Sequence, residues 1–150
     1  MSERPILLQA DHLKKWFPVR KGVFSKAAQY VKAVDDVSLV IREGETLGIV
    51  GESGCGKSTL ARTMMRLIEP TEGTVLFQGQ DLTSADKESL RRMRRDIQII
   101  FQDPYASLNP RQRVSDILAE PFLIHKLGSR EAAMKRAEEL LDLVGLSQDS

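Results

Sequence analysis

The feature that most constrains the fold is a glycine-rich segment at residues 51–59, which fits the pattern G-x-x-x-x-G-K-[ST]. A nearly continuous apolar run from Thr46 to Val50 comes directly before it. From Lys57 to Ile68 the apolar residues recur at helical spacing. Strand, tight loop and helix in this order are the context that the pattern requires, so the sequence predicts an α/β protein.

The chemistry of this loop follows from its backbone. Glycines allow the chain to wrap tightly, so that successive N–H groups point at phosphate oxygens, and the positive end of the following helix adds to the attraction. Lys57 is expected to reach the β- and γ-phosphates, and the Ser58 hydroxyl to ligate Mg²⁺. The predicted phosphate-binding residues are Gly51, Glu52, Ser53, Gly54, Cys55, Gly56, Lys57, Ser58 and Thr59.

Length and charge exclude other classes of function. The 150 residues fit one ordinary domain, and 22 Lys and Arg against 21 Asp and Glu leave a formal charge of +1. Bulk charge therefore does not favour a nucleic-acid partner. The basic cluster at 91–95 has Asp86, Glu88 and Asp96 beside it, which favours a solvated helix face. His12 and His125 are far apart in sequence, and we predict no zinc site.

Several observations bear on the compartment. Cys55 is the single cysteine, so no disulfide framework is possible, and we expect a reducing compartment in which Cys55 serves as a small residue fitting a tight loop. No run approaches the roughly 20 apolar residues of a membrane span. The stretch from Ile6 to Leu8 is too short for a signal-peptide core. We expect a soluble, intracellular chain that is able to dock on a membrane protein.

Apolar patterns and turn residues divide the rest of the chain. An α/β part is expected over residues 1–103, and a mostly helical part over 104–150. Arg42 to Glu45 is expected to be a turn, and Ser129 and Gly145 to begin and end the last helix. The predicted strands are 37–41, 46–50, 75–77 and 97–101, and the other predicted helices are 57–68 and 86–95.

Gln102 follows the predicted strand 97–101 at its carboxyl end, the edge where parallel α/β sheets bind their ligands. Its amide oxygen is suited to Mg²⁺ or to an attacking water, and it can withdraw without leaving a buried charge. Gly51 leaves the other predicted strand end in the same way.

Together with the phosphate loop, the string from Phe101 to Arg111 and the turn at 42–45 resemble the ATP-binding subunit of an ABC transporter. Residues 102–111, 13–19 and 31–38 more narrowly resemble the dipeptide, oligopeptide and nickel importers. The resemblance implies a P-loop NTPase fold with an N-terminal antiparallel β part, a parallel-sheet core that is incomplete here, and the start of an α-helical subdomain.

The resemblance also implies roles. ATP and Mg²⁺ are the implied cofactors, with Lys57 and Gln102 as catalytic residues and Ser58 and Gln102 as metal ligands. Residues 104–111 would meet the coupling helix of a permease. An upstream aromatic residue stacks on adenine in this family, and Phe17 is favoured for that role over Trp16.

The implied partners are a second ATPase subunit, identical or different, and two transmembrane permease subunits. An extracytoplasmic solute-binding protein is implied indirectly, and nucleic acid is not. The implied location is the cytoplasmic side of the inner membrane, where the subunit is peripheral. The substrate, peptide or nickel, is not expected to be specified by any residue of this chain.

Hydrolysis in this family needs motifs that the chain does not show: an apolar strand ending in Asp and Glu, an LSGGQ-like motif and a later His. The runs 99–103 and 140–142 do not qualify, because Gln102 interrupts the first and the second belongs to a helical stripe. We therefore expect these 150 residues to be the first part of an ATPase, able to bind nucleotide weakly but not to turn it over. The alternatives are a soluble small-molecule P-loop kinase and a non-transport ABC ATPase.

Overall fold

The computed structural model describes residues 4–19, 29–102 and 108–146. They form two compact units, Met1–Leu90 and Arg91–Ser150, and each is considered by itself. The expected change of character at residue 103 stays a prediction. Among the described residues, no helix is both long and apolar enough to cross a membrane.

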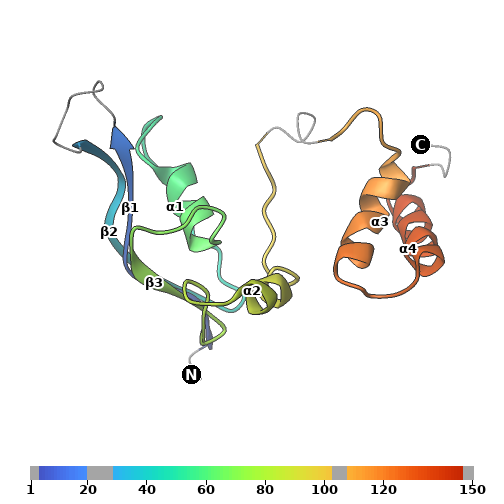
Figure 1. Ribbon diagram of the computed structural model, residues 1–150, viewed down its shortest axis with the longest axis horizontal. Coiled ribbons are helices and arrows are strands. Elements are labelled where there is room, and N and C mark those ends of the chain that lie inside the picture. The colour runs from blue at the N-terminus through green and yellow to red at the C-terminus, as the bar shows by residue number, and fades with distance from the viewer. Residues whose placement is uncertain (1–3, 20–28, 103–107, 147–150) are drawn as a thin grey trace. The chain divides into compact units, whose positions relative to one another are not determined.

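The first unit is built on an antiparallel sheet with the strand order β2-β1-β3-β4 (Figure 1). The predicted strands 37–41 and 75–77 are confirmed, since they lie within β2 and β3. Beyond β2 the chain turns at Gly44, which has a φ of 67°, and the Glu45 N–H donates to the Arg42 carbonyl over 3.1 Å. The strands are β1 (Ile6–Val19), β2 (Gln29–Arg42), β3 (Glu72–Phe77) and β4 (Gln80–Asp81).

The pairing of β1 with β2 shifts register at four places, and two regions of this irregular pairing are described here. At the first, His12 and Asp36 both have positive φ, and the His12 Nδ1 lies 2.7 Å from the Asp36 Oδ1. At the second, Lys15 pairs with Val34 and the next residue pairs with Lys32, so Ala33 is the extra residue of a bulge. This bulge bears on the candidate site.

Helix α1 (Lys57–Met64) contacts both β1 and β2 and buries Leu60, Thr63 and Met64. The helix predicted over 57–68 is confirmed in its start but is shorter than expected. Arg66 adopts a φ of 49°, and the Leu67 N–H donates to the Arg62 carbonyl over 2.8 Å, which closes the helix end.

The predicted strands 46–50 and 97–101 are wrong for this structure, because neither segment forms a strand. A strand needs a neighbour to take up its backbone hydrogen bonds, and none of the described strands pairs with either segment. Most of their apolar side chains are exposed, with Val50 92% and Ile100 94% accessible, while Ile97 and Ile99 are half-buried.

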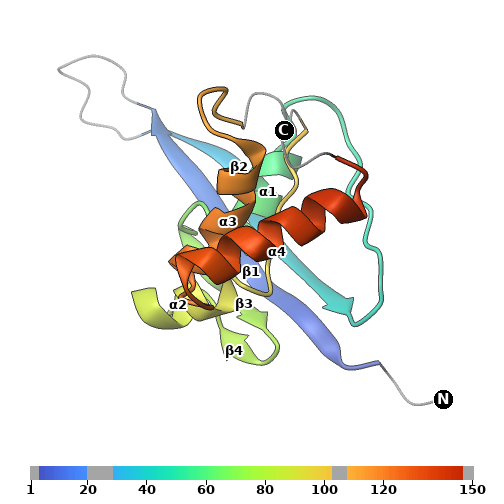
Figure 2. The ribbon, with the colours of Figure 1, turned by 90° about the vertical axis from the view of Figure 1, so that its right-hand side faces the viewer.

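The second unit contains α3 (Val114–Ile124) and α4 (Arg130–Leu143), which pack side by side (Figure 1, Figure 2). Small residues, Ala119 on α3 and Ala133 and Ala137 on α4, form its core. Ser129 caps α4 as predicted, its Oγ accepting from the Ala132 N–H over 3.2 Å. Gly145 ends the helix region with a φ of 75°, also as predicted.

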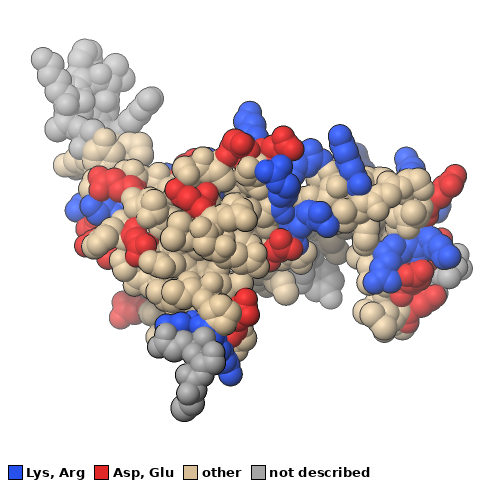
Figure 3. All heavy atoms as spheres, turned by 90° about the horizontal axis from the view of Figure 1, so that it is seen from below, with Lys and Arg blue, Asp and Glu red and all other residues tan. Residues whose placement is uncertain are grey.

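Helix α2 (Lys87–Met93) confirms the charged helix predicted near 86–95. The Asp86 carboxylate accepts from the Ser89 N–H over 2.7 Å and so caps its start. Arg91, Arg92, Arg94 and Arg95 are exposed. On the face shown in Figure 3, basic and acidic side chains are interspersed, in keeping with the near balance of charges.

Candidate functional site

The glycine-rich loop lies at the start of α1, as its pattern predicts. Gly54 and Gly56 have φ values of 83° and 95°, a region that L side chains rarely adopt, so both positions require glycine. Gly56 is the N-cap residue of α1 and offers no side chain to the helix. The loop conformation therefore follows from the placement of its glycines.

Gly56 is also held by a close approach to β2. A Cβ atom added at Gly56 would lie 2.1 Å from the Ala33 carbonyl oxygen, far inside van der Waals contact. Ala33 is the extra residue of the bulge between the register pairs Lys15–Val34 and Trp16–Lys32 of β1 and β2. The bulge thus brings a backbone carbonyl against the loop, and only glycine leaves room for it.

The positive end of α1 is free of acidic side chains in its first turn. Within the described part of the chain, the backbone N–H groups of Lys57, Ser58 and Thr59 have no protein acceptor, as expected for a first helical turn. Such donors, with the helix dipole behind them, form an anion-binding position.

The Lys57 ammonium lies over the loop. Its Nζ donates to the carbonyls of Gly51 over 2.8 Å and Glu52 over 2.6 Å, and it lies 3.4 Å from the Cys55 Sγ. The Ser58 side chain is exposed, and no hydrogen bond of its hydroxyl occurs among the described residues. Unpartnered N–H donors, an ammonium and a hydroxyl on one short segment fit a phosphate with its Mg²⁺ ion.

Two aromatic side chains lie near the end of β1. Phe17 is 38% accessible, with the Lys15 Nζ 5.1 Å from its ring centroid. Trp16 is half-buried, and its indole N–H donates to the Asp35 Oδ1 over 3.0 Å. Phe17 pairs with Val31 across the ladder, two residues from Ala33, so its strand segment lies beside the loop.

Gln102 is exposed and belongs to the second unit, where it follows the irregular segment 97–101. Its approach to the phosphate loop stays a prediction. Residues 103–107 of the expected permease-contacting string lie outside the described residues. The end of the string forms a turn in which the Asn109 Oδ1 accepts from the Arg111 N–H over 3.0 Å.

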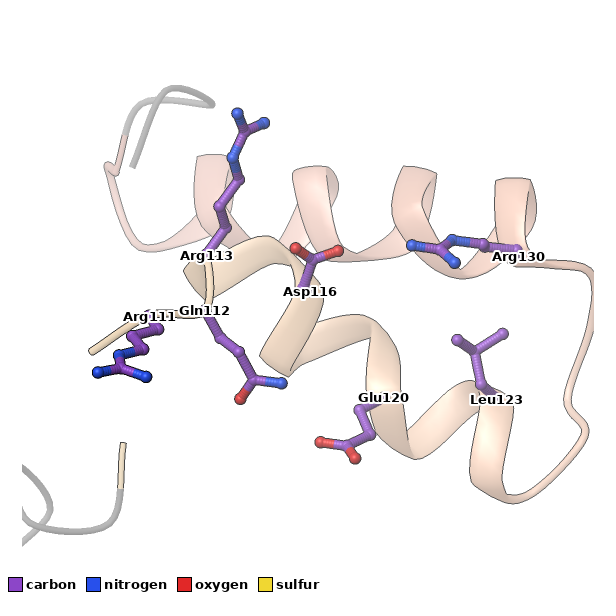
Figure 4. A pocket seen from close by; sticks show the side chains of 7 residues that line it. All are labelled: Arg111, Gln112, Arg113, Asp116, Glu120, Leu123 and Arg130. Carbon is purple, nitrogen blue, oxygen red and sulfur yellow. The ribbon is translucent and has the colours of Figure 1, made fainter. Parts of the chain in front are cut away.

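A pocket of about 490 Å³ opens beside this turn in the second unit (Figure 4). Arg111 lies at one end and Arg130 at the other, with Asp116 and Glu120 of α3 between them. Its lining is completed by Gln112, Arg113 and Leu123. The pocket is therefore mostly charged and carries both signs.

Some features of the site escaped sequence reasoning. No residue pattern announces the Ala33 bulge or the carbonyl that it brings to Gly56. The bonds from Lys57 to the Gly51 and Glu52 carbonyls were also missed.

No group of three or more metal-ligating side chains occurs among residues 4–19, 29–102 and 108–146.

The sequence model of the family described as "ABC transporter" matches residues 34–150. The chain is 52% identical to the oligopeptide transport ATP-binding protein AppF of Bacillus subtilis over 146 residues, which is 97% of this chain and 44% of that protein. It is 46% identical to the di/tripeptide transport ATP-binding protein DppF of Pseudomonas aeruginosa, covering 93% and 43% of the two.

One solved structure has a similar fold over most of this chain. A dimeric ATP-binding cassette bound to ADP and Pi aligns with a TM-score of 0.72 at 28% identity, covering 95% of this chain and 59% of that one. The chain thus spans less than half the length of these curated relatives.

Proposed function

Because the chain belongs to the ABC transporter family, we propose that it is the nucleotide-binding part of an ATPase subunit that powers the import of peptides. The observation that carries the proposal is the loop 51–59, with its free N–H donors and Lys57 at the start of α1. The relatives named for oligopeptide and di/tripeptide transport support peptides as the cargo over nickel. They also favour transport over a soluble kinase or a non-transport ABC ATPase.

In this proposal the loop binds the triphosphate of ATP. The N–H groups of the first turn of α1 donate to phosphate oxygens, and the Lys57 ammonium exchanges loop carbonyls for the β- and γ-phosphates. The Lys57 ammonium stabilises the negative charge that develops on the transferred phosphoryl group. A bound nucleotide supplies the phosphoanhydride bond whose hydrolysis drives transport in the complete subunit.

We assign Mg²⁺ to the Ser58 hydroxyl and, in the complete subunit, to the Gln102 amide oxygen. The exposure of both side chains supports this assignment. Phe17 is assigned to the adenine ring, since its side chain is exposed on the strand next to the bulge that meets the loop.

The proposed partners are a second ATPase subunit and two permease subunits, with an extracytoplasmic solute-binding protein acting through the permease. Contact with the permease is assigned to residues 104–111, and the charged pocket beside Arg111 supports a polar interface there. The subunit would then be peripheral on the cytoplasmic face of the membrane.

Calorimetric titration with ATP, with and without Mg²⁺, tests the site. The chain is expected to bind ATP more tightly with Mg²⁺, and Ser58→Ala is expected to remove that gain. Ser129→Ala, which alters only the cap of α4, serves as the control. An unchanged Mg²⁺ effect in Ser58→Ala contradicts the metal assignment.

Uptake of a labelled tripeptide by cells tests the transport function. In cells that depend on the complete subunit, Lys57→Ala is expected to abolish uptake. Unchanged uptake of peptide in that strain contradicts the proposal.

A further inference from the structure

The single tryptophan, Trp16, is held from several sides. Its indole N–H donates to the Asp35 Oδ1 over 3.0 Å, and the Lys32 Nζ donates to the Asp35 Oδ2 over 3.1 Å. The Lys32 Nζ also lies 4.7 Å from the indole centroid, and the Lys14 Nζ lies 5.6 Å from it. We call Trp16, Lys14, Lys32 and Asp35 the Trp16 cluster.

The electrostatics of the Trp16 cluster are consistent with its geometry. The hydrogen bond from Lys32 lowers the pKa of Asp35, and that from Trp16 adds to the effect. The hydrogen bond to Glu72 raises the pKa of Lys14, whose Nζ lies 2.7 Å from the Glu72 Oε2. Both residues thus keep their charges near neutral pH, and cations over an indole ring are attracted to it.

The backbone joins the cluster to the segment before β3. The Trp16 N–H donates to the Thr71 Oγ1 over 2.9 Å, and the Thr71 N–H donates to the Lys14 carbonyl over 2.8 Å. This part of β1 is therefore attached on one side to β2, through Asp35, and on the other to the start of β3.

Phe17, the residue assigned to the adenine ring, is the neighbour of Trp16 in β1. Consecutive residues of a strand point to opposite faces, so Phe17 lies on the other side of the sheet from Trp16. The Ala33 bulge, which meets Gly56 of the loop, lies between the register pairs Lys15–Val34 and Trp16–Lys32. The Trp16 cluster thus lies next to the stretch of backbone that sets the position of Phe17 relative to the loop.

We infer that Trp16 is a positioning residue for nucleotide recognition. It fixes the end of β1 through Asp35 and Lys32, so that Phe17 is presented to the base of a nucleotide whose phosphates lie in the loop. The inference rests on the proposed function and adds to it the residue that holds the base-stacking side chain in place. In this account Trp16 does not contact the base, because its N–H group is bonded to Asp35 and its ring lies beside the ammonium groups of Lys14 and Lys32.

The test compares MgATP with magnesium tripolyphosphate, which has the same phosphates and no base. Dissociation constants are measured by calorimetry on the chain. Phe17→Ala is expected to weaken ATP binding by about 5- to 150-fold, the range for loss of one base-stacking contact, and to leave tripolyphosphate binding unchanged. Asp35→Asn and Trp16→Phe are expected to weaken ATP binding alone, by a smaller factor.

Two further measurements separate positioning from other roles. The double variant Phe17→Ala/Asp35→Asn is expected to bind ATP no more weakly than Phe17→Ala, because Asp35 acts through Phe17. Trp16 emission is expected to respond equally to ATP and tripolyphosphate. Tyr30→Phe, which keeps an exposed ring 6.4 Å from the Trp16 ring, is the matched control and should bind both ligands normally.

Each contrary outcome has a distinct meaning. The positioning role is overturned if Asp35→Asn and Trp16→Phe weaken the binding of ATP and of tripolyphosphate equally. It is also overturned if the losses of ATP affinity add up in the double variant, or if ATP binding is unchanged in every variant. Stronger quenching of Trp16 by ATP than by tripolyphosphate overturns it too, since the base then lies on Trp16. If the unmodified chain binds both ligands equally, the positioning role fails and the phosphate site stands. If it binds neither, the proposed function fails.

Discussion

Replacement of Gly56 by alanine is the sharpest test of how the phosphate loop is held. Gly56 has a φ of 95°, where an L side chain costs about 1–2 kcal/mol. The added Cβ would also lie 2.1 Å from the Ala33 carbonyl oxygen, so loop or strand must shift, at a cost of about 1–3 kcal/mol typical of overpacking. We expect Gly56→Ala to lower the free energy of unfolding by about 2–5 kcal/mol.

The matched control is Gly54→Ala. Gly54 has a similar φ of 83°, but nothing lies within 4 Å of its added Cβ, so only the backbone cost of about 1–2 kcal/mol applies. The assay is urea unfolding followed by Trp16 emission, because Trp16 lies in the same unit as the loop. Equal destabilisation by the two substitutions would refute the role given to the Ala33 carbonyl.

Three other predictions concern the first unit. Arg66→Ala is expected to lower the free energy of unfolding by about 1.5–3 kcal/mol in the same urea assay, because the guanidinium donates to the carbonyls of Leu82 over 3.0 Å and Ala85 over 2.6 Å; a loss no larger than that of the exposed Arg62→Ala would contradict it. MgATP is expected to slow modification of Cys55 by a thiol reagent, since its Sγ lies 3.4 Å from the Lys57 Nζ, and an unchanged rate counts against the site. The Asp35 pKa is lowered from its ordinary value of 3.8, so its contribution is present at neutral pH and lost as the pH falls through the lowered pKa. Trp16 emission should therefore change with a midpoint below 3.8, and a transition that persists in Asp35→Asn would exclude Asp35 as its cause.

Local features of the fold were predictable because they depend on residues close in sequence. The loop and the start of α1 could be predicted from the glycines and Lys57. The positive φ angles and the contacts of Lys57 with the loop involve residues close in sequence. The cap at Ser129 and the stop at Gly145 are likewise local. The alternation within 37–41 predicted the C-terminal part of β2 for the same reason.

Features that depend on distant partners were not predictable. The apolar runs 46–50 and 97–101 have the composition of buried strands, but a strand forms only where a neighbour completes its hydrogen bonds. The bulge at Ala33 depends on the pairing of two strands, and its carbonyl meets Gly56 only after that pairing. The Trp16 cluster joins residues from two strands in the same way.

The central claim is that the loop 51–59 binds the phosphates of ATP through Lys57. Calorimetric titration of the chain with MgATP measures this directly, beside Lys57→Ala and the control Lys135→Gln, which alters an exposed ammonium on α4. The account predicts saturable binding to the unmodified chain, weakened by about 10- to 150-fold in Lys57→Ala, since a charged hydrogen bond to phosphate contributes about 1.5–3 kcal/mol. Lys135→Gln should stay within a few-fold of the unmodified chain. Undetectable binding, or binding that Lys57→Ala leaves unchanged, would contradict the account.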